Sequence, residues 1–245
     1  MSQHNISTVA HLIAEPVRAV MLITLTDGRA RPAGVLANAA GVTAQTASAH
    51  LSKLLDGGLL RVENKGRHRF YSLAGPHIPR VLESLASVGP VTPAWRSPVN
   101  RGAREMRFAR CCYDHLAGQL GVALTRAMLT RGYLAERNEY EYELTPAGHS
   151  LLLRIGVEPT GALSAGAVQA HRCLDWTERQ YHVSGPLGAQ LMDTFCVRDW
   201  IRRSHETRGV IVTPAGWDAL REYFGIEVDD LQASRAGSID RSENA

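Results

Sequence analysis

Apolar side chains recur at the spacing of an α-helix near the start of the chain, and one proline divides that pattern. Residues 9–25 carry the helical pattern, with Pro16 inside it. A proline suits the first turn of a helix but not its interior. We therefore predict one helix that ends before Pro16 and another that begins there. The alanine-rich residues 33–40 predict a third, short helix.

A fourth helix is predicted after a tight turn. Gly41 suits the left-handed backbone that often follows a helix end. Thr43 is a favourable N-cap for a helix over residues 44–55, and Gly57 and Gly58 should end it. Two helices joined by a short glycine turn are typical of a helix-turn-helix.

After this helix the pattern becomes that of a β-hairpin. Residues 59–63 and 68–73 predict two strands around a turn at residues 64–67. Residues 76–88 predict a further helix. The stretch 89–98 is rich in Pro and Gly, which is typical of a linker.

The remainder of the chain contains an internal repeat at an offset of 67 residues. Residues 115–124 resemble residues 182–191, and Leu144–Gly148 later matches Val212–Gly216. Each copy predicts a helix, a hairpin and a short helix, an arrangement similar to a winged helix.

These patterns predict a mainly α-helical α+β fold in which small β-hairpins form the wings. Residues 1–90 are predicted to form a winged helix-turn-helix DNA-binding domain, and residues 91–100 a linker. Residues 101–227 are predicted to form an effector or dimerisation domain made of two copies, at about 108–155 and 172–225. Residues 228–245 are predicted to form a flexible tail.

The net charge of +3 on 245 residues is unevenly distributed. Residues 1–90 hold nine Lys or Arg against five Asp or Glu, whereas residues 91–245 are near neutral. Four cations in the hairpin are opposed by one carboxylate; these residues are Arg61, Lys65, Arg67, Arg69 and Glu63. A cationic cluster directly after a helix-turn-helix indicates a polyanionic partner.

Composition excludes several classes of protein. Apolar residues make up 44% and charged residues 21%, as in globular rather than disordered chains. No run of 18 apolar residues exists and the first residues lack a secretory pattern, so we expect no membrane partner. The four cysteines, which are too few for a disulfide framework, are Cys111, Cys112, Cys173 and Cys196. We therefore expect reduced thiols in a cytoplasmic, nucleoid-associated protein.

Four short motifs accompany the predicted helices and hairpin. They are a proline-arginine helix start, a helix end of the form His-Leu-x-x-Leu, a Gly-Leu stop and a basic wing that ends Tyr-x-Leu. They occur here as Glu15–Arg18, His50–Leu54, Gly58-Leu59 and Tyr71–Leu73. With them, residues 12–73, and more loosely residues 9–88, resemble the ArsR/SmtB family of bacterial winged-helix repressors. The resemblance implies a homodimer that binds operator DNA and releases it when an effector binds.

The predicted second helix of the helix-turn-helix has the length and polar face of a major-groove reader. Gln45 can bond adenine, the hydroxyls can bond bases or phosphates, and the cations suit phosphate oxygens. His50 has two interpretations, a phosphate contact or a structural residue. The predicted DNA contacts are Thr43, Gln45, Thr46, Ser48, Ala49, His50, Lys53, Arg61, Lys65, Arg67, His68 and Arg69.

The sequence departs from the metal sensors of the family it resembles. Many of those members carry Cys-x-Cys on the helix before the recognition helix, but residues 33–40 contain no cysteine. Others use Asp and His ligands on the last helix of the domain, where this chain offers only His77 and Glu83. Any effector site is therefore expected in the second region.

Cysteines and histidines gather at the start of each copy. Thiolate and imidazole are preferred ligands of soft and borderline metal ions. In a helix over residues 108–118, Cys111 and His115 would share a face and Cys112 would point elsewhere. The candidate metal ligands are Cys111, Cys112, His115 and Cys173, and the candidate effector site adds Trp176 and His182. The alternative interpretation is that of plain buried cysteines.

Glycines follow each of the two matching histidines at the third and sixth positions, and helix interiors disfavour glycine. Close approach of two helices would explain them. A ligand pocket between the copies, faced by His115 and His182, is the second interpretation.

No nucleophile arrangement, phosphate-binding loop or metalloprotease motif is visible, so we expect a regulator rather than an enzyme. The leading interpretation is a repressor released from its operator by a small molecule or metal ion bound in the second domain. One alternative is a thiol-based metal, metalloid or redox sensor that uses Cys111, Cys112 and Cys173. Another is that the second domain is an oligomerisation or interaction module without a ligand.

Overall fold

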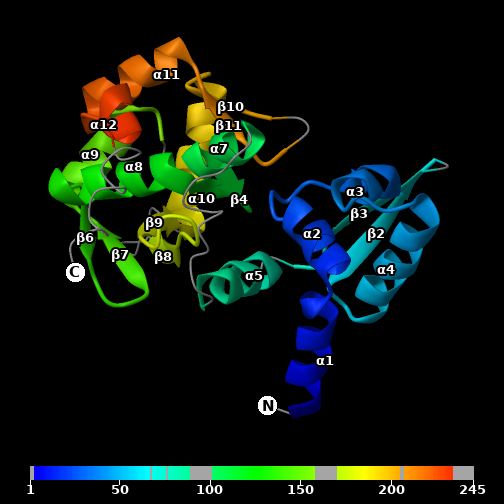
Figure 1. Ribbon diagram of the computed structural model, residues 1–245. Coiled ribbons are helices and arrows are strands. Elements are labelled where there is room, and N and C mark those ends of the chain that lie inside the picture. Colours follow the sequence, from blue (N-terminus) through cyan, green and yellow to red (C-terminus); the bar gives the residue numbers. More distant parts are fainter. Residues whose placement is uncertain are drawn as a thin grey trace, which may run out of the picture. The chain divides into compact units, whose positions relative to one another are not determined.

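The computed structural model describes residues 3–66, 68–75, 77–88, 101–157, 170–204 and 207–233. The chain divides into two compact units, Met1–Leu85 and Ala86–Ala245, each with its own hydrophobic core (Figure 1). The predicted linker at residues 91–100 and the predicted DNA contact Arg67 lie outside the described residues.

The first unit is a winged helix-turn-helix, as predicted. Pro16 begins the second helix, Gly41 has a φ of 64°, and Thr43 accepts a hydrogen bond from the backbone N–H of Thr46. The three strands form an antiparallel sheet in the order β1-β3-β2. In chain order the elements are α1 (Gln3–Ala14), α2 (Pro16–Thr24), β1 (Arg31–Pro32), α3 (Ala33–Ala39), α4 (Ala44–Asp56), β2 (Leu60–Lys65), β3 (His68–Leu73) and α5 (His77–Val88).

Arg18 joins the first two helices from inside this unit. Its side chain is buried and donates hydrogen bonds to the backbone oxygens of Leu12 (2.7 Å) and His11 (2.8 Å). These carbonyls lie at the end of α1, where helical partners are missing. Arg18 therefore caps α1, while the Glu15 carboxylate caps α2.

No single helix among the described residues has the length and apolar character needed to cross a membrane. Residues Ile6–Ala14 and Pro16–Thr24 meet that criterion only as a pair, and they are bent by 90°.

The second unit contains the predicted duplication, but each copy begins with a hairpin that the sequence pattern did not predict. Each copy is then hairpin, helix, hairpin and helix, and strands of both copies share a sheet in the order β6-β7-β8-β9. In chain order the elements are α7 (Arg101–Phe108), β4 (Arg110–Cys112), β5 (His115–Ala117), α8 (Gly118–Thr130), β6 (Leu134–Glu136), β7 (Glu141–Leu144), α9 (Pro146–Arg154), β8 (Ala170–Leu174), β9 (Tyr181–Ser184), α10 (Gly185–Val197), β10 (Ile201–Arg203), β11 (Val210–Val212), α11 (Pro214–Ala219), η2 (Leu220–Phe224) and α12 (Val228–Ala233).

The two copies contact each other reciprocally. Helix α8 of the first copy packs against β9 of the second, and α10 of the second packs against β5 of the first. Arg131, after α8, donates a hydrogen bond to the Phe224 carbonyl and lies against Gly225. Arg198, after α10, lies against Gly156 in the same way. Exchange of equivalent contacts is typical of two-fold related partners, so the duplication resembles a dimer within one chain.

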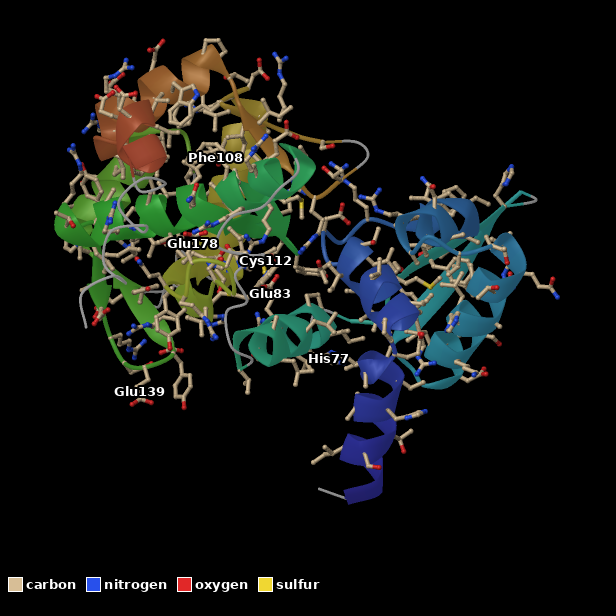
Figure 2. The ribbon with its side chains drawn as sticks, viewed as in Figure 1. His77, Glu83, Phe108, Cys112, Glu139 and Glu178 are labelled. Atoms are coloured by element: carbon tan, nitrogen blue, oxygen red, sulfur yellow. The ribbon has the colours of Figure 1, made fainter. Side chains whose placement is uncertain are left out.

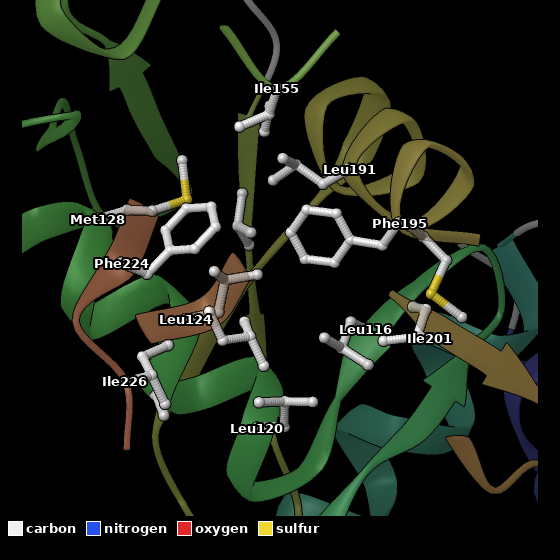
Figure 3. Packing of buried hydrophobic residues seen from close by; sticks show 14 of the residues in the cluster. Leu116, Leu120, Leu124, Met128, Ile155, Leu191, Phe195, Ile201, Phe224 and Ile226 are labelled. Carbon is white, nitrogen blue, oxygen red and sulfur yellow. The ribbon is translucent and has the colours of Figure 1, made fainter. Parts of the chain in front are cut away.

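The core of the second unit lies between these helices. Leu124 and Met128 of α8 and Phe195 of α10 converge near Phe224, whose ring centroid lies 6.0 Å from that of Phe195 (Figure 3). These residues are almost completely buried. The duplicated helices therefore build one continuous core rather than two small ones.

The prediction of a flexible tail that starts at residue 228 is wrong for residues 228–233, which form α12. Leu231 is only 3% exposed and joins the core of the second unit. Burial of this one leucine anchors a segment whose neighbours are mostly polar. The rest of the predicted tail lies outside the described residues.

Candidate functional site

Helix α4 separates a buried apolar face from an exposed polar face. Ala47, Leu51 and Leu54 are buried in the core of the first unit. The opposite face is exposed and consists of Gln45, Thr46, Ser48, Ala49, Ser52 and Lys53. The hydroxyl of Thr43 caps the helix and that of Ser48 bonds the carbonyl of Ala44. Gln45 and Lys53 are therefore the long polar side chains that this face offers to a groove.

The β2–β3 hairpin lies beside α4 (Figure 1). Of its cations, Arg61, Lys65 and Arg69 are exposed. The Arg61 guanidinium donates a hydrogen bond across the hairpin to Ser72 (2.9 Å). Lys65 and Arg69 lie over the rings of Phe70 and Tyr71, at 5.6 and 5.5 Å from the ring centroids. These aromatic rings hold the cations at the surface of the strand pair. His68 is also exposed.

His50 is a partly buried residue that pairs with a residue of another helix. Its Nδ1 lies 3.3 Å from the Glu15 carboxylate, the N-cap of α2. Of the two interpretations of His50, this contact favours the structural one. His50 is therefore assigned to the contact of α4 with the start of α2 and not to DNA.

A four-residue cluster, Cys112, His115, Cys173 and His182, lies in the second unit; Figure 2 labels Cys112. Cys112 faces His115 across β4–β5, and Cys173 faces His182 across β8–β9. One donor atom from each residue lies within 4.8 Å of those from the other three. The two copies thus contribute equivalent Cys-His pairs to one place.

Each histidine of the cluster turns Nδ1 toward a carboxylate and Nε2 toward the other histidine. Nδ1 of His115 lies 3.0 Å from Asp114, and Nδ1 of His182 lies 3.6 Å from Asp175. The two Nε2 atoms are 3.1 Å apart. Burial alone lowers the pKa of His115, but Cys112 and Asp114 together raise that pKa to about 9.

Asp175 connects the cluster to a buried ion pair. Its carboxylate lies 2.9 Å from the Arg110 guanidinium, and both side chains are fully buried. It also accepts a hydrogen bond from the backbone N–H of Gly118 (2.7 Å), the first residue of α8. Burial by itself raises the pKa of Asp175, but Arg110, His182 and hydrogen bonds from Gly118 and Thr177 lower it well below its usual range.

The structure brings together three of the four predicted metal ligands and adds His182, a residue predicted only for the effector site. A helix over residues 108–118 was the wrong assumption, because residues 110–117 form the hairpin β4–β5. In a hairpin Cys112, not Cys111, is the cross-strand partner of His115, and Cys111 is buried in the core instead. Trp176 lies over the Arg110 guanidinium at 5.2 Å and is not a member of the cluster.

The glycines after each histidine allow close approach of helix and hairpin. Gly118 and Gly185 have positive φ angles of 81° and 72°. A Cβ atom on Gly188 would lie 2.8 Å from the Val183 carbonyl oxygen and 3.0 Å from Cβ of His115. The glycines therefore allow close approach, but of a helix to a hairpin strand and not of two helices as predicted. The two histidines contact each other where a pocket was the alternative.

Gly188→Ala is expected to lower the thermal stability of the second unit, because the added methyl group must displace the Val183 backbone or His115. Gly34→Ala is the matched control, since no atom lies within 4 Å of the added carbon. At position 34, alanine reduces the backbone freedom of the unfolded chain, which favours the folded state. Scanning calorimetry should show a lower melting temperature only for Gly188→Ala, and equal melting temperatures would contradict this account of the glycine.

Comparison with known proteins places the chain in a family. A family model described as a helix-turn-helix domain matches residues 13–63. The HTH-type transcriptional regulator YdfF of Bacillus subtilis (strain 168) is 35% identical over 224 residues, which are 91% of this chain and 99% of that protein. The chain belongs to the HTH-type transcriptional regulators. This regulator is related to YdfF along nearly its whole length, so the second unit is part of the shared architecture.

Two further proteins each match about a third of the regulator. The HTH-type transcriptional regulator CmtR of Mycobacterium tuberculosis is 35% identical over 88 residues, 36% of this chain and 74% of that protein. The homodimeric winged helix-turn-helix DNA-binding domain of Mb0332 from Mycobacterium bovis, a possible ArsR-family regulator, is 27% identical. The match covers 35% of this chain and 78% of the Mb0332 chain, and its TM-score is 0.32.

Proposed function

We propose that this regulator is an ArsR-type repressor that binds an operator as a homodimer and is released by an effector bound in its second unit. The exposed polar face of α4 beside a cationic hairpin is the observation that supports operator binding most directly. A single module of this size makes few base contacts, so a dimer on two half-sites is the arrangement that reaches useful specificity.

In this proposal α4 enters the major groove and the hairpin follows the phosphate backbone. Gln45 bonds an adenine edge in the bidentate manner of amide side chains. Thr43, Thr46, Ser48 and Ala49 line the same surface. The phosphate contacts come from the hairpin and the end of α4; they are Lys53, Arg61, Lys65, Arg67, His68 and Arg69.

The effector role is assigned to the second unit because the first unit lacks the thiol ligands and the second contains the four-residue cluster. The cluster connects both copies of the duplication, so occupancy can bias how the copies pack. Release needs a difference of about 1–3 kcal/mol between effector affinities for the free and DNA-bound protein.

Gln45→Ala is expected to weaken specific operator binding by about 1–3 kcal/mol, because the bidentate contact to one base is lost. Binding to unrelated DNA should stay the same, since phosphate contacts carry it. Fluorescence anisotropy with the regulator's own promoter region measures both affinities. Gln180→Ala, an exposed glutamine of the second unit, is the control and should leave both unchanged. Equal operator affinity of wild type and Gln45→Ala would contradict the assignment of α4.

A further inference from the structure

We propose that Cys112, His115, Cys173 and His182 form a tetrahedral, mononuclear site for a divalent transition-metal ion of the zinc class. The site uses one cross-strand Cys-His pair from each copy of the duplication. It differs from any site on the winged helix-turn-helix, because all four residues belong to the second unit.

The spacing of the donor atoms fits one ion. Metal–nitrogen and metal–sulfur bonds of about 2.0 and 2.3 Å in a tetrahedron separate two nitrogens by about 3.3 Å and other donor pairs by somewhat more. The Nε2 atoms of His115 and His182 are 3.1 Å apart, and all four donor atoms lie within 4.8 Å of one another. An ion can therefore be bound with small side-chain adjustments and no change of backbone.

The surroundings of the histidines are those of metal ligands. A ligating imidazole usually turns its second nitrogen to a carboxylate, which fixes the ring and strengthens the metal bond. Asp114 and Asp175 occupy these positions on His115 and His182. Nδ1 of His182 is buried and has no hydrogen-bond partner among the described residues. When Nε2 of His182 binds an ion, a small movement of Nδ1 toward Asp175 would give Nδ1 a hydrogen-bond acceptor.

The donor set selects the class of ion. Two thiolates and two imidazoles in a tetrahedron suit Zn²⁺ and its substitutes Co²⁺ and Cd²⁺, whereas Mg²⁺ and Ca²⁺ require oxygen ligands. Cys112 and Cys173 bind as thiolates and the two histidines bind through a deprotonated Nε2. Any proton on these four donor atoms passes to solvent when the metal bonds form. The four protein ligands complete the tetrahedron and leave no position for a substrate, so the site binds rather than catalyses.

Occupancy of the site joins the β4–β5 and β8–β9 hairpins and thus the two copies. Because Asp175 also pairs with Arg110 and holds the start of α8, the ion is connected to the core of the second unit. We assign the effector role to this ion, an assignment that rests on the proposed function. The existence of the site does not depend on DNA binding.

The test uses the full chain, reduced and stripped of metal, titrated with Co²⁺ and then Zn²⁺. We expect one ion per chain by elemental mass spectrometry, with the visible absorption of tetrahedral Co²⁺ and a thiolate charge-transfer band that Zn²⁺ abolishes. Cys112→Ser and Cys173→Ser should each weaken binding by at least about 100-fold. Cys196→Ser, a cysteine outside the cluster, is the matched control and should bind as the wild type does.

A second measurement avoids any folding defect of the variants. In the wild type, Zn²⁺ should slow alkylation of Cys112 and Cys173 and leave that of Cys196 unchanged, as followed by peptide mass mapping. A Co²⁺ complex without thiolate bands, or equal protection of Cys196, would overturn the site. If Zn²⁺ binds as described but operator affinity does not change, the effector assignment fails and the site stands. If operator binding is intact and no ion binds, the site and its effector role are refuted, and the DNA-binding part of the proposed function stands.

Discussion

Replacing Asp175 by alanine is expected to destabilise the second unit by about 3–5 kcal/mol. The Arg110 guanidinium opposite it is fully buried, and removal of its carboxylate leaves a positive charge in a region that water does not reach. The substitution also removes the hydrogen bonds that Asp175 accepts from Gly118 and Thr177. This single carboxylate therefore stabilises both the ion pair and the start of α8.

Urea unfolding followed by tryptophan fluorescence measures this effect selectively, because all four tryptophans belong to residues 86–245. Arg202→Ala serves as the control, since its pair with Asp199 is exposed to solvent and screened. We expect no measurable change for the control. A loss below about 1 kcal/mol for Asp175→Ala would mean that the buried pair contributes little to this fold.

The second large effect concerns the cations of the proposed DNA surface. The triple variant Lys53→Ala, Lys65→Ala, Arg69→Ala is expected to bind DNA with a much weaker dependence on salt. If each side chain meets one phosphate in each half of a dimer, the slope of log K against log salt becomes shallower by about five. Affinity at low salt should fall for operator and unrelated DNA alike, because phosphate contacts do not distinguish sequences.

The matched control removes the same number of positive charges from the second unit. Arg137, Arg202 and Arg221 are all exposed, and their alanine variant changes the net charge equally. Only the first triple variant should alter the slope. If both variants reduce the slope to the same extent, overall charge rather than the α4 and hairpin surface would explain DNA binding.

Much of the first unit could be predicted because its signals are local. Pro16 starts a helix, Gly41 takes a left-handed conformation and Thr43 caps α4, and each of these follows from the residue itself and its immediate neighbours. The amphipathic spacing of α4 likewise separates buried leucines from an exposed polar face.

The cluster was only partly predictable because it depends on strand register and on packing between the copies. The offset of 67 residues aligns His115 with His182, but it aligns Cys112 with Arg179. The connection in β8–β9 is longer than that in β4–β5, so the equivalence of Cys112 and Cys173 appears only in the cross-strand pairing. Three-residue strands also give too short a pattern to be distinguished from a helix.

The most direct test of the account is a titration of labelled promoter DNA with the full chain, once metal-free and once loaded with Zn²⁺. We predict specific binding by the metal-free protein and a Kd that is about 5–150-fold higher with Zn²⁺. The difference should disappear in Cys112→Ser and persist in Cys196→Ser. Identical affinities of the metal-free and the loaded wild type would contradict the effector role of the ion bound in the second unit.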